Sequence, residues 1–307
     1  MSEPLVWLPF EPDVLGDPPD GLRYEVHRRG ADDRARASLE DVAFYVPPYE
    51  SLRSDSELVA RMPRLEVVQT MTAGVEHIRP FVPEGVLLCN GRGIHDASTA
   101  ELAVALTLAS LRGIPDFVRA QDRQRWRHRP LQALADKRVL IVGYGQIGAA
   151  IEDRLRPFEV TAVDRVARTA REGVHAQAEL PALLPQGDVV ILVVPATEET
   201  RGLVDRDFLA RMKDGALLVN VARGSVVVSD DLLAELRTGR LSAALDVTDP
   251  EPLPVHHPLW SAPNLLISPH VGGASSAMWP RAHRLVRQQL ERFVRGEPLV
   301  NQMTGDY

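Results

Sequence analysis

Short apolar runs, separated by turn residues and by helix-like stretches, recur along the first ninety residues of the chain. Each run has the length and the aliphatic or β-branched character of a strand, and the runs are Pro4–Leu8, Tyr24–His27, Val42–Val46, Val67–Thr70 and Val86–Cys89. Between the third and the fourth run, polar residues 54–57 precede the apolar pair Leu58 and Val59, as they do where a helix begins. Strands that alternate with helices predict a parallel sheet that is covered on both faces.

The second part of the chain continues this alternation. Residues 96–111 predict a helix that is apolar nearly all round and therefore buried, with Ser98 and Glu101 at the spacing of a capping box. Segment 119–129, which contains five arginines, predicts a polar, irregular arm that is solvated or contacts another subunit. Further strands are predicted at Arg138–Val142, Val160–Val163, Val189–Val194, Leu217–Val221, Ala243–Val247 and Leu265–Ile267, with a helix from Ser229 to Gly239. This pattern predicts a doubly wound α/β architecture.

Composition narrows the class of protein. The length of 307 residues suits about two domains, and the net charge of −7 disfavours nonspecific binding to nucleic acid. No apolar run reaches the roughly 18–20 residues of a membrane span, and the N-terminus lacks the basic region of a secretory signal. The one cysteine, Cys89, cannot form an intrachain disulfide or a multi-thiolate metal site. We therefore expect a cytoplasmic protein with no nucleic-acid or membrane partner.

A glycine-rich sequence between a strand and a helix predicts a dinucleotide site. In GYGQIG, Gly143 allows a tight turn, Gly145 lets the backbone approach a pyrophosphate, and Gly148 lets the helix pack closely on the strand. The diphosphate is expected on the unpaired amides of the helix N-terminus, where Gln146 and Ile147 lie.

The residue expected at the adenosine ribose is Asp164, which ends the next predicted strand 19 residues after Gly145. Its carboxylate can accept hydrogen bonds from both ribose hydroxyls and would repel a 2′-phosphate, which favours NAD. Arg165 and Arg168 stand close by, however, and an arginine there can receive that phosphate. NADP therefore stays open as the cofactor.

Segments after the glycine-rich turn, read together with it, resemble the D-isomer-specific 2-hydroxyacid dehydrogenase family. The match rests on Gly143–Gly148, Asn220–Gly224, Leu245–Leu253 and Ser268–Gly273, with support from Ala73–Val75, Ala100–Glu101, Pro195, Thr197 and Thr200. These segments run in the family's order from about residue 70 to the C-terminus.

The resemblance implies a discontinuous domain layout. A Rossmann-type nucleotide-binding domain, residues 97–271, would be inserted in a smaller flavodoxin-like α/β substrate domain made of residues 1–96 and 272–307. The active site would lie in the cleft between the domains, with hinges near Ala97 and Gly272.

The resemblance also implies which residues carry the chemistry. Arg223, which follows a predicted strand, would bind the substrate's carboxylate and keto oxygen with its planar charged fork; its alternative role is a structural ion pair. His270 would donate a proton to the alkoxide that hydride transfer produces. Glu251 would orient His270 and favour its protonated form, and a glutamate there argues against the formate dehydrogenase branch. The backbone amides of Ala73, Gly74 and Val75 would hold the substrate carboxylate, although an ordinary turn is the alternative for this segment.

Cofactor contacts are implied at further positions of the matched segments, with Asp246 near the nicotinamide. They are Pro195, Thr200, Val221, Ala222, Asp246 and Gly272, besides the glycine-rich turn. Thr248 departs from the family, which usually has a bulky aromatic residue there. No metal site is expected, because the neighbouring pair His256 and His257 lacks accompanying ligands and reads as a solvated loop.

The resemblance at these residues predicts an NAD(P)-dependent oxidoreductase that interconverts a 2-keto acid and a D-2-hydroxy acid. The expected substrate is a small keto acid such as glyoxylate or hydroxypyruvate. The enzyme is expected to form a homodimer. One alternative is another hydride-transfer enzyme on this scaffold, such as a phosphite-oxidising or NADP-preferring one. The other is an NAD(H)-sensing protein similar to the family's transcriptional corepressors. Side-chain specificity would come from Tyr45–Tyr49, Trp126 or Trp279, aromatic residues that more often serve packing.

Overall fold

The computed structural model describes residues 3–28, 38–49 and 53–304, and the chain divides into two compact units. Unit 1 comprises Met1–His95 and Ser276–Tyr307, and unit 2 comprises Asp96–Ser275. Each unit contains one parallel sheet, with five strands in unit 1 and seven in unit 2. Unit 2 is therefore an insertion in the sequence of unit 1, and its bounds differ by a few residues from the predicted 97–271.

The sheet of unit 1 has the strand order β2-β1-β3-β4-β5. Its strands are β1 (Leu5–Leu8), β2 (Arg23–Val26), β3 (Val42–Tyr45), β4 (Val67–Gln69) and β5 (Leu87–Cys89). All five predicted strands are confirmed within one residue at each end, because continuous apolar runs are what a sheet covered on both faces requires.

One helix covers each face of this sheet. Helix α9 (Met278–Arg295) buries residues that repeat every four positions, namely Met278, Ala282, Val286 and Leu290. They pack in one cluster with Val6 and Phe44, whereas Val59 of α2 (Arg53–Val59) packs on the other face with Leu5 and Trp7. The core of unit 1 is thus completed by a helix from the end of the chain.

The sheet of unit 2 has the strand order β12-β11-β10-β9-β6-β7-β8. Its strands are β6 (Arg138–Val142), β7 (Ala162–Ala167), β8 (His175–Ala176), β9 (Val189–Leu192), β10 (Leu217–Asn220), β11 (Ser242–Leu245) and β12 (Leu265–Ile267). The chain runs outward from β6 to β8 and then crosses back to β9 on the other side of β6. This reversal confirms the doubly wound architecture and creates a topological switch point between β6 and β9, where such folds bind ligands.

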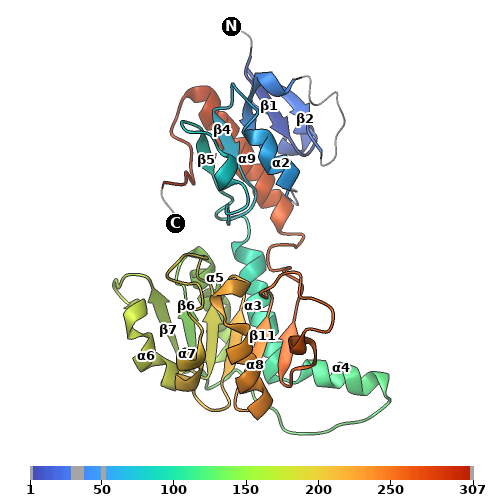
Figure 1. Ribbon diagram of the computed structural model, residues 1–307, viewed down its shortest axis with the longest axis vertical. Coiled ribbons are helices and arrows are strands. Elements are labelled where there is room, and N and C mark those ends of the chain that lie inside the picture. The colour runs from blue at the N-terminus through green and yellow to red at the C-terminus, as the bar shows by residue number, and fades with distance from the viewer. Residues whose placement is uncertain (1–2, 29–37, 50–52, 305–307) are drawn as a thin grey trace. The chain divides into compact units, whose positions relative to one another are not determined.

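Helices cover both faces of the seven-stranded sheet (Figure 1). They are α3 (Asp96–Leu111), α5 (Gln146–Leu155), α6 (Leu180–Leu183), α7 (Arg206–Arg211) and α8 (Ser229–Thr238), whereas α4 (Ile114–Asp122) follows α3 without covering a face. Residues of α3 and α5 pack with Val139 and Ile141 in one cluster, and residues of α6, α7 and α8 pack with Leu140 and Val142 in the other. The predicted start and end of α8 are confirmed, with Gly239 in the left-handed conformation that ends helices.

Two local predictions are wrong. Ser98 does not cap a helix, because α3 already begins at Asp96, and the Ser98 hydroxyl instead lies 2.6 Å from that of Ser275. Part of the predicted irregular arm is helical, since α4 extends to Asp122. Figure 1 shows α4 pointing away from the sheet of its unit, and Trp126 beyond it is 98% exposed.

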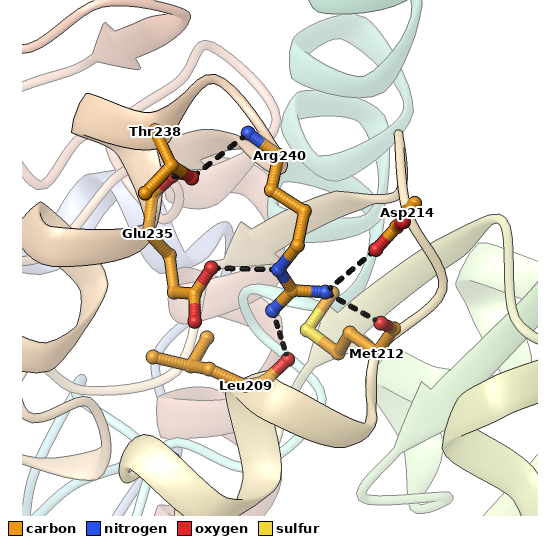
Figure 2. A network of polar contacts seen from close by, with 6 residues as sticks. All are labelled: Leu209, Met212, Asp214, Glu235, Thr238 and Arg240. Atoms are coloured by element: carbon orange, nitrogen blue, oxygen red, sulfur yellow. Dashed lines mark hydrogen bonds and ion pairs between the residues drawn. The ribbon is translucent and has the colours of Figure 1, made fainter.

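A single arginine ties together the ends of α7 and α8 (Figure 2). The guanidinium of Arg240 donates hydrogen bonds to the main-chain carbonyls of Leu209 and Met212 and to the carboxylates of Glu235 and Asp214. The Glu235 hydrogen bond raises the pKa of Arg240 above its usual value. The carbonyls at the end of a helix lack partners within it; here the Leu209 carbonyl also accepts from the Met212 amide, and the Met212 carbonyl accepts from Arg240.

Candidate active site

The glycine-rich turn after β6 lies at the switch point, and its geometry fits a dinucleotide. Gly143 has a φ of +106°, and a Cβ there would lie 2.5 Å from the carbonyl carbon of Val193, which follows β9. A Cβ on Gly148 would lie 2.7 Å from the Gly143 carbonyl oxygen. A Cβ on Gly145 would meet nothing within 4 Å, so open space lies directly before α5. The amides at the start of a helix attract a phosphate group, and this turn has room for one.

The structure contradicts the strand end that was predicted at Asp164. Strand β7 does not end there but continues to Ala167, and Asp164 pairs in register with Leu140, in the middle of β6. Its carboxylate accepts two hydrogen bonds from the Arg138 guanidinium, and its side chain is only 11% exposed. The strand end predicted at Asp164 is therefore wrong, and the ribose contact of Asp164 stays a prediction.

Arg165 is bound to Glu152, and its contact with a 2′-phosphate stays a prediction. Its guanidinium binds both carboxylate oxygens of Glu152, and Glu152 also accepts a hydrogen bond from the Tyr144 hydroxyl. Hydrogen bonding to Arg165 lowers the pKa of Glu152. Arg165 of β7 and Glu152 of α5 thus form an ion pair that also holds Tyr144 of the glycine-rich turn.

The loop after β9 is organised by Thr200. Its hydroxyl donates to the Pro195 carbonyl at 2.6 Å and accepts from the Thr197 amide at 2.8 Å. Thr200 is buried and Pro195 is exposed. The two predicted cofactor contacts therefore belong to one rigid turn beside the glycine-rich turn.

Arg223 follows β10 in a turn that a neighbouring asparagine shapes. The Asn220 side chain accepts from the Ala222 amide and donates to the Arg223 carbonyl, both at 3.0 Å. A Cβ on Gly224 would lie 1.9 Å from the Thr248 carbonyl oxygen, so only glycine fits between this turn and the loop after β11. Asn220 was not predicted as a site residue, although a polar residue at the end of an apolar strand is a usable signal.

Glu251 and His270 are brought together by the ends of β11 and β12. His270 Nδ1 lies 2.5 Å from Glu251 Oε1, and both side chains are partly exposed. With Nδ1 engaged, Nε2 is the imidazole atom that remains for a substrate. Because β10, β11 and β12 are neighbours, Arg223, Glu251 and His270 all follow the same edge of one parallel sheet.

Asp246 holds the loop that carries His270. Its carboxylate accepts from the Ser268 hydroxyl at 2.6 Å and from the amides of Val271 and Gly272 at 3.0 and 2.8 Å. Its main-chain carbonyl accepts from the His270 amide at 2.7 Å. His270 has a φ of +53°, a left-handed conformation that is uncommon without glycine. Asp246 was predicted as a cofactor contact, and the structure gives it this additional loop-holding role.

In unit 1, the predicted carboxylate-binding turn is fixed by its neighbours. Asn90 donates its side-chain amide to the Ala73 carbonyl at 2.9 Å, and the Thr72 hydroxyl donates to the Gly74 carbonyl at 2.7 Å. Gly74 and Val75 are buried. Asn90, which directly follows β5, is a further residue that sequence reasoning missed.

The aromatic residues considered for specificity have different environments. Tyr45 is fully buried against Trp7, so it serves packing, whereas Tyr49 is half-buried beside His95. Trp279 is 44% exposed beside His283.

The described residues contain neither a membrane-spanning helix nor a cluster of metal ligands. Within residues 3–28, 38–49 and 53–304, no helix is both long enough and apolar enough to cross a bilayer. In the same part of the chain, no group of three or more His, Cys, Asp or Glu side chains could hold a metal ion.

Known proteins resemble this chain in sequence and in structure. The family model described as "D-isomer specific 2-hydroxyacid dehydrogenase, NAD binding domain" matches residues 104–272. A human glyoxylate reductase/hydroxypyruvate reductase is 35% identical over 78% of this chain and 77% of its own length. A glyoxylate reductase of Thermofilum pendens is 33% identical over 79% of this chain and 76% of its own. A D-isomer specific 2-hydroxyacid dehydrogenase from Xanthobacter autotrophicus, solved with NADPH and MES, superposes with a TM-score of 0.80 at 31% identity, covering 99% of this chain and 98% of that one.

Proposed function

The chain belongs to the D-isomer specific 2-hydroxyacid dehydrogenase family, and we propose that its substrate is a small 2-keto acid such as glyoxylate or hydroxypyruvate. The enzyme is an NAD(P)-dependent oxidoreductase that interconverts 2-keto acids and D-2-hydroxy acids. The hydrogen bond between Glu251 and His270 is the observation that supports this assignment of roles most directly. Arg223 follows a neighbouring strand of the same sheet.

The roles follow from the chemistry of keto-acid reduction. With its diphosphate on the glycine-rich turn, the reduced dinucleotide would supply a hydride to the keto carbon. Arg223 binds the carboxylate and polarises the keto oxygen with its charged fork. His270 then donates the proton on Nε2 to the developing alkoxide, while Glu251 holds the opposite ring nitrogen. The amides of residues 73–75 bind the substrate carboxylate.

Asn220 and Asp246 act in this proposal without touching the reacting atoms. Asn220 fixes the turn that presents Arg223, and Asp246 fixes the loop that presents His270. Rigid support of this kind keeps catalytic groups within the small tolerance that the chemistry allows.

The small-substrate assignment is supported by the relatives named as glyoxylate and hydroxypyruvate reductases, at 33% and 35% identity. It is tested by steady-state kinetics with glyoxylate, hydroxypyruvate, pyruvate and a branched 2-keto acid, each with NADH and with NADPH. We expect the highest kcat/KM with glyoxylate or hydroxypyruvate. A higher kcat/KM with the branched acid would overturn the substrate assignment, and no oxidation with any keto acid would overturn the reaction.

The assignment of His270 has its own test. His270→Gln removes the proton donor and should lower kcat by about 10²–10⁴-fold, the usual contribution of a general acid. Binding of the dinucleotide, measured by calorimetry, should stay within about twofold. Retention of turnover in this variant would mean that another group donates the proton.

We also propose that the enzyme is a cytoplasmic homodimer formed through unit 2. Helix α4 exposes Ile114 and Val118, and the segment beyond it exposes Trp126 almost completely. A cavity of about 890 Å³ is lined by residues of α4, of the segment beyond it and of β12, and by Trp260. We propose that α4 of a second copy of the chain occupies this cavity. Sedimentation equilibrium of the wild type and of Val118→Asp tests the proposal. The wild type should be dimeric and the variant monomeric.

A further inference from the structure

The carboxyl end of β7 determines which dinucleotide the enzyme accepts. The amides of Gly143 and Tyr144 both donate to the Val166 carbonyl at 2.8 Å, and Val142, the last residue of β6, pairs in register with Val166. The β7 residues level with the glycine-rich turn are therefore Val166 and Ala167. In Rossmann folds the residue at this end of the second strand recognises the adenosine ribose, and an acidic residue there selects NAD. Here two aliphatic residues occupy that end.

Two carboxylates near β7, those of Asp164 and Glu152, each bind an arginine. Asp164 is bound by Arg138 through both carboxylate oxygens, and Glu152 is bound by Arg165 in the same way. Each carboxylate side chain is only 11% exposed. Turning either one toward a ribose would break two charge-assisted hydrogen bonds and leave a partly buried arginine without them.

Two exposed arginines follow the end of the strand. Arg171 donates from Nη2 to the Tyr144 carbonyl, inside the glycine-rich turn, and its guanidinium carbon lies 5.9 Å from the centre of the Tyr144 ring. Arg168 lies two residues after Val166, and its side chain lines a cavity together with Glu199 and Asp207. A phosphate monoester carries about two negative charges near neutral pH, so it attracts a guanidinium more strongly than a single carboxylate does.

From this arrangement we propose that the enzyme prefers NADP(H) to NAD(H), with Arg168 and Arg171 binding the 2′-phosphate of the adenosine ribose. The inference rests on the proposed function and reverses the preference for NAD that the sequence position of Asp164 suggested. Its physical basis is the absence of a carboxylate at Val166 and Ala167 together with two arginines directly beyond them. Arginine suits this role because its fork matches the geometry of phosphate oxygens.

The test measures binding of two nucleotide fragments that cannot react. Calorimetry compares adenosine 2′,5′-bisphosphate with 5′-AMP, which differ by the 2′-phosphate alone. We expect the bisphosphate to bind the wild type at least about tenfold more tightly, as one charge-assisted contact supplies. Arg168→Ala should remove about tenfold or more of that affinity and leave 5′-AMP within about twofold. In the double variant Arg168→Ala/Arg171→Ala the two fragments should bind equally.

Arg237→Ala is the matched control, because Arg237 is an exposed arginine at the end of α8. It should change the affinity for neither fragment. Equal binding of the two fragments to the wild type, or an equal loss of both in Arg168→Ala, would overturn the NADP(H) preference alone. Failure of both fragments and of both dinucleotides to bind would overturn the dinucleotide site itself, and with it the proposed function.

Discussion

His270 has a backbone conformation that its neighbours must maintain. Its φ of +53° is left-handed, and sparsely populated conformations of this kind cost about 1–3 kcal/mol unless the surroundings hold them. Asp246 supplies that support through four hydrogen bonds from Ser268, His270, Val271 and Gly272. A Cβ on Gly272 would lie 2.9 Å from Asp246 Oδ2, so the loop fits closely around this carboxylate. Asp246 is thus a positioning residue for the proton donor.

Replacing Asp246 tests this role. Asp246→Asn keeps the size of the side chain but turns one acceptor oxygen into an NH₂ group that faces an N–H or O–H donor. We expect kcat with the best keto acid to fall by about tenfold to a hundredfold, which corresponds to losing one charge-assisted hydrogen bond of about 1.5–3 kcal/mol. The Kd for the dinucleotide should change by less than about threefold. Steady-state kinetics and calorimetry measure the two effects separately.

Ser268→Ala is the matched comparison, because it removes only one of the donors to Asp246. It should lower kcat by less than Asp246→Asn does. If the Kd for the dinucleotide rose in Asp246→Asn by as large a factor as kcat fell, Asp246 would instead be a direct cofactor contact. That is the role that the family resemblance implied.

At the scale of elements, the strand, glycine-rich turn and helix at 138–155 could be predicted because their signals are local. The apolar run, the glycines and the helical spacing all lie within eighteen residues of one another. The end of β7 could not be predicted in this way. Asp164 and Arg165 look like residues after a strand, but Arg138 and Glu152 neutralise them across the sheet edge. Paired charges can lie inside a strand, and their partners stand 26 and 13 residues away in sequence.

Helix α4 could not be predicted from the amino-acid composition of its segment. Arginines dominate the segment around its end, and its apolar residues Ile114 and Val118 face solvent rather than a core. Its start had a usable signal, since Gly113 is followed by a proline within the first two helical positions. A helix whose apolar face has no partner in its own unit is consistent with the proposed contact between two copies of the chain.

The arginine between α7 and α8 gives a stability prediction for unit 2. Arg240→Ala removes the donors to two helix-end carbonyls and two carboxylates, and the Arg240 side chain is only 23% exposed. We expect the free energy of unfolding to fall by about 2–4 kcal/mol, because the Met212 carbonyl and the Glu235 carboxylate, whose side chain is only 20% exposed, lose this donor. Urea unfolding followed by circular dichroism measures it.

The neighbouring exposed Arg237 again supplies the control, and Arg237→Ala should stay within about 0.5 kcal/mol of the wild type. Arg240→Lys should fall between the two, because an ammonium can reach some of these acceptors but lacks the fork. If Arg240→Ala and Arg237→Ala had the same free energy of unfolding, the hydrogen bonds of Arg240 would contribute nothing measurable to the stability of unit 2.

At the scale of the whole molecule, the order of the motifs identified an inserted domain that local patterns could not reveal. Strands and helices alternate in both units, so periodicity alone would divide the chain near its middle. The resemblance of residues 70 onward placed the insertion instead, and the structure divides the chain at 95/96 and 275/276. The exact junction depends on contacts such as the hydroxyl pair of Ser98 and Ser275, which no sequence spacing indicates.

The discontinuity of unit 1 leads to a prediction about its folding. Residues 1–95 lack α9, which fills one face of their sheet with Met278, Val286 and Leu290, all at most 2% exposed. Losing one buried side chain of this size costs about 2–5 kcal/mol, and a whole domain is stable by only about 5–15 kcal/mol. The fragment 1–95 should therefore show no cooperative thermal transition by circular dichroism. Residues 96–275, which keep both of their core clusters, should unfold cooperatively and bind adenosine 2′,5′-bisphosphate.

A joined fragment separates the effect of α9 from the effect of cutting the chain. Residues 1–95 connected to 276–307 by a flexible glycine-serine linker restore α9 to the sheet and should recover a cooperative transition. Leu290→Asp in that joined fragment should abolish the transition again, because it places an unpaired charge in the cluster that contains Val6 and Phe44. If fragment 1–95 alone melted as cooperatively as the joined one, the first five strands would form a stable unit without the last helix, and the late segment would serve only to return the chain from unit 2.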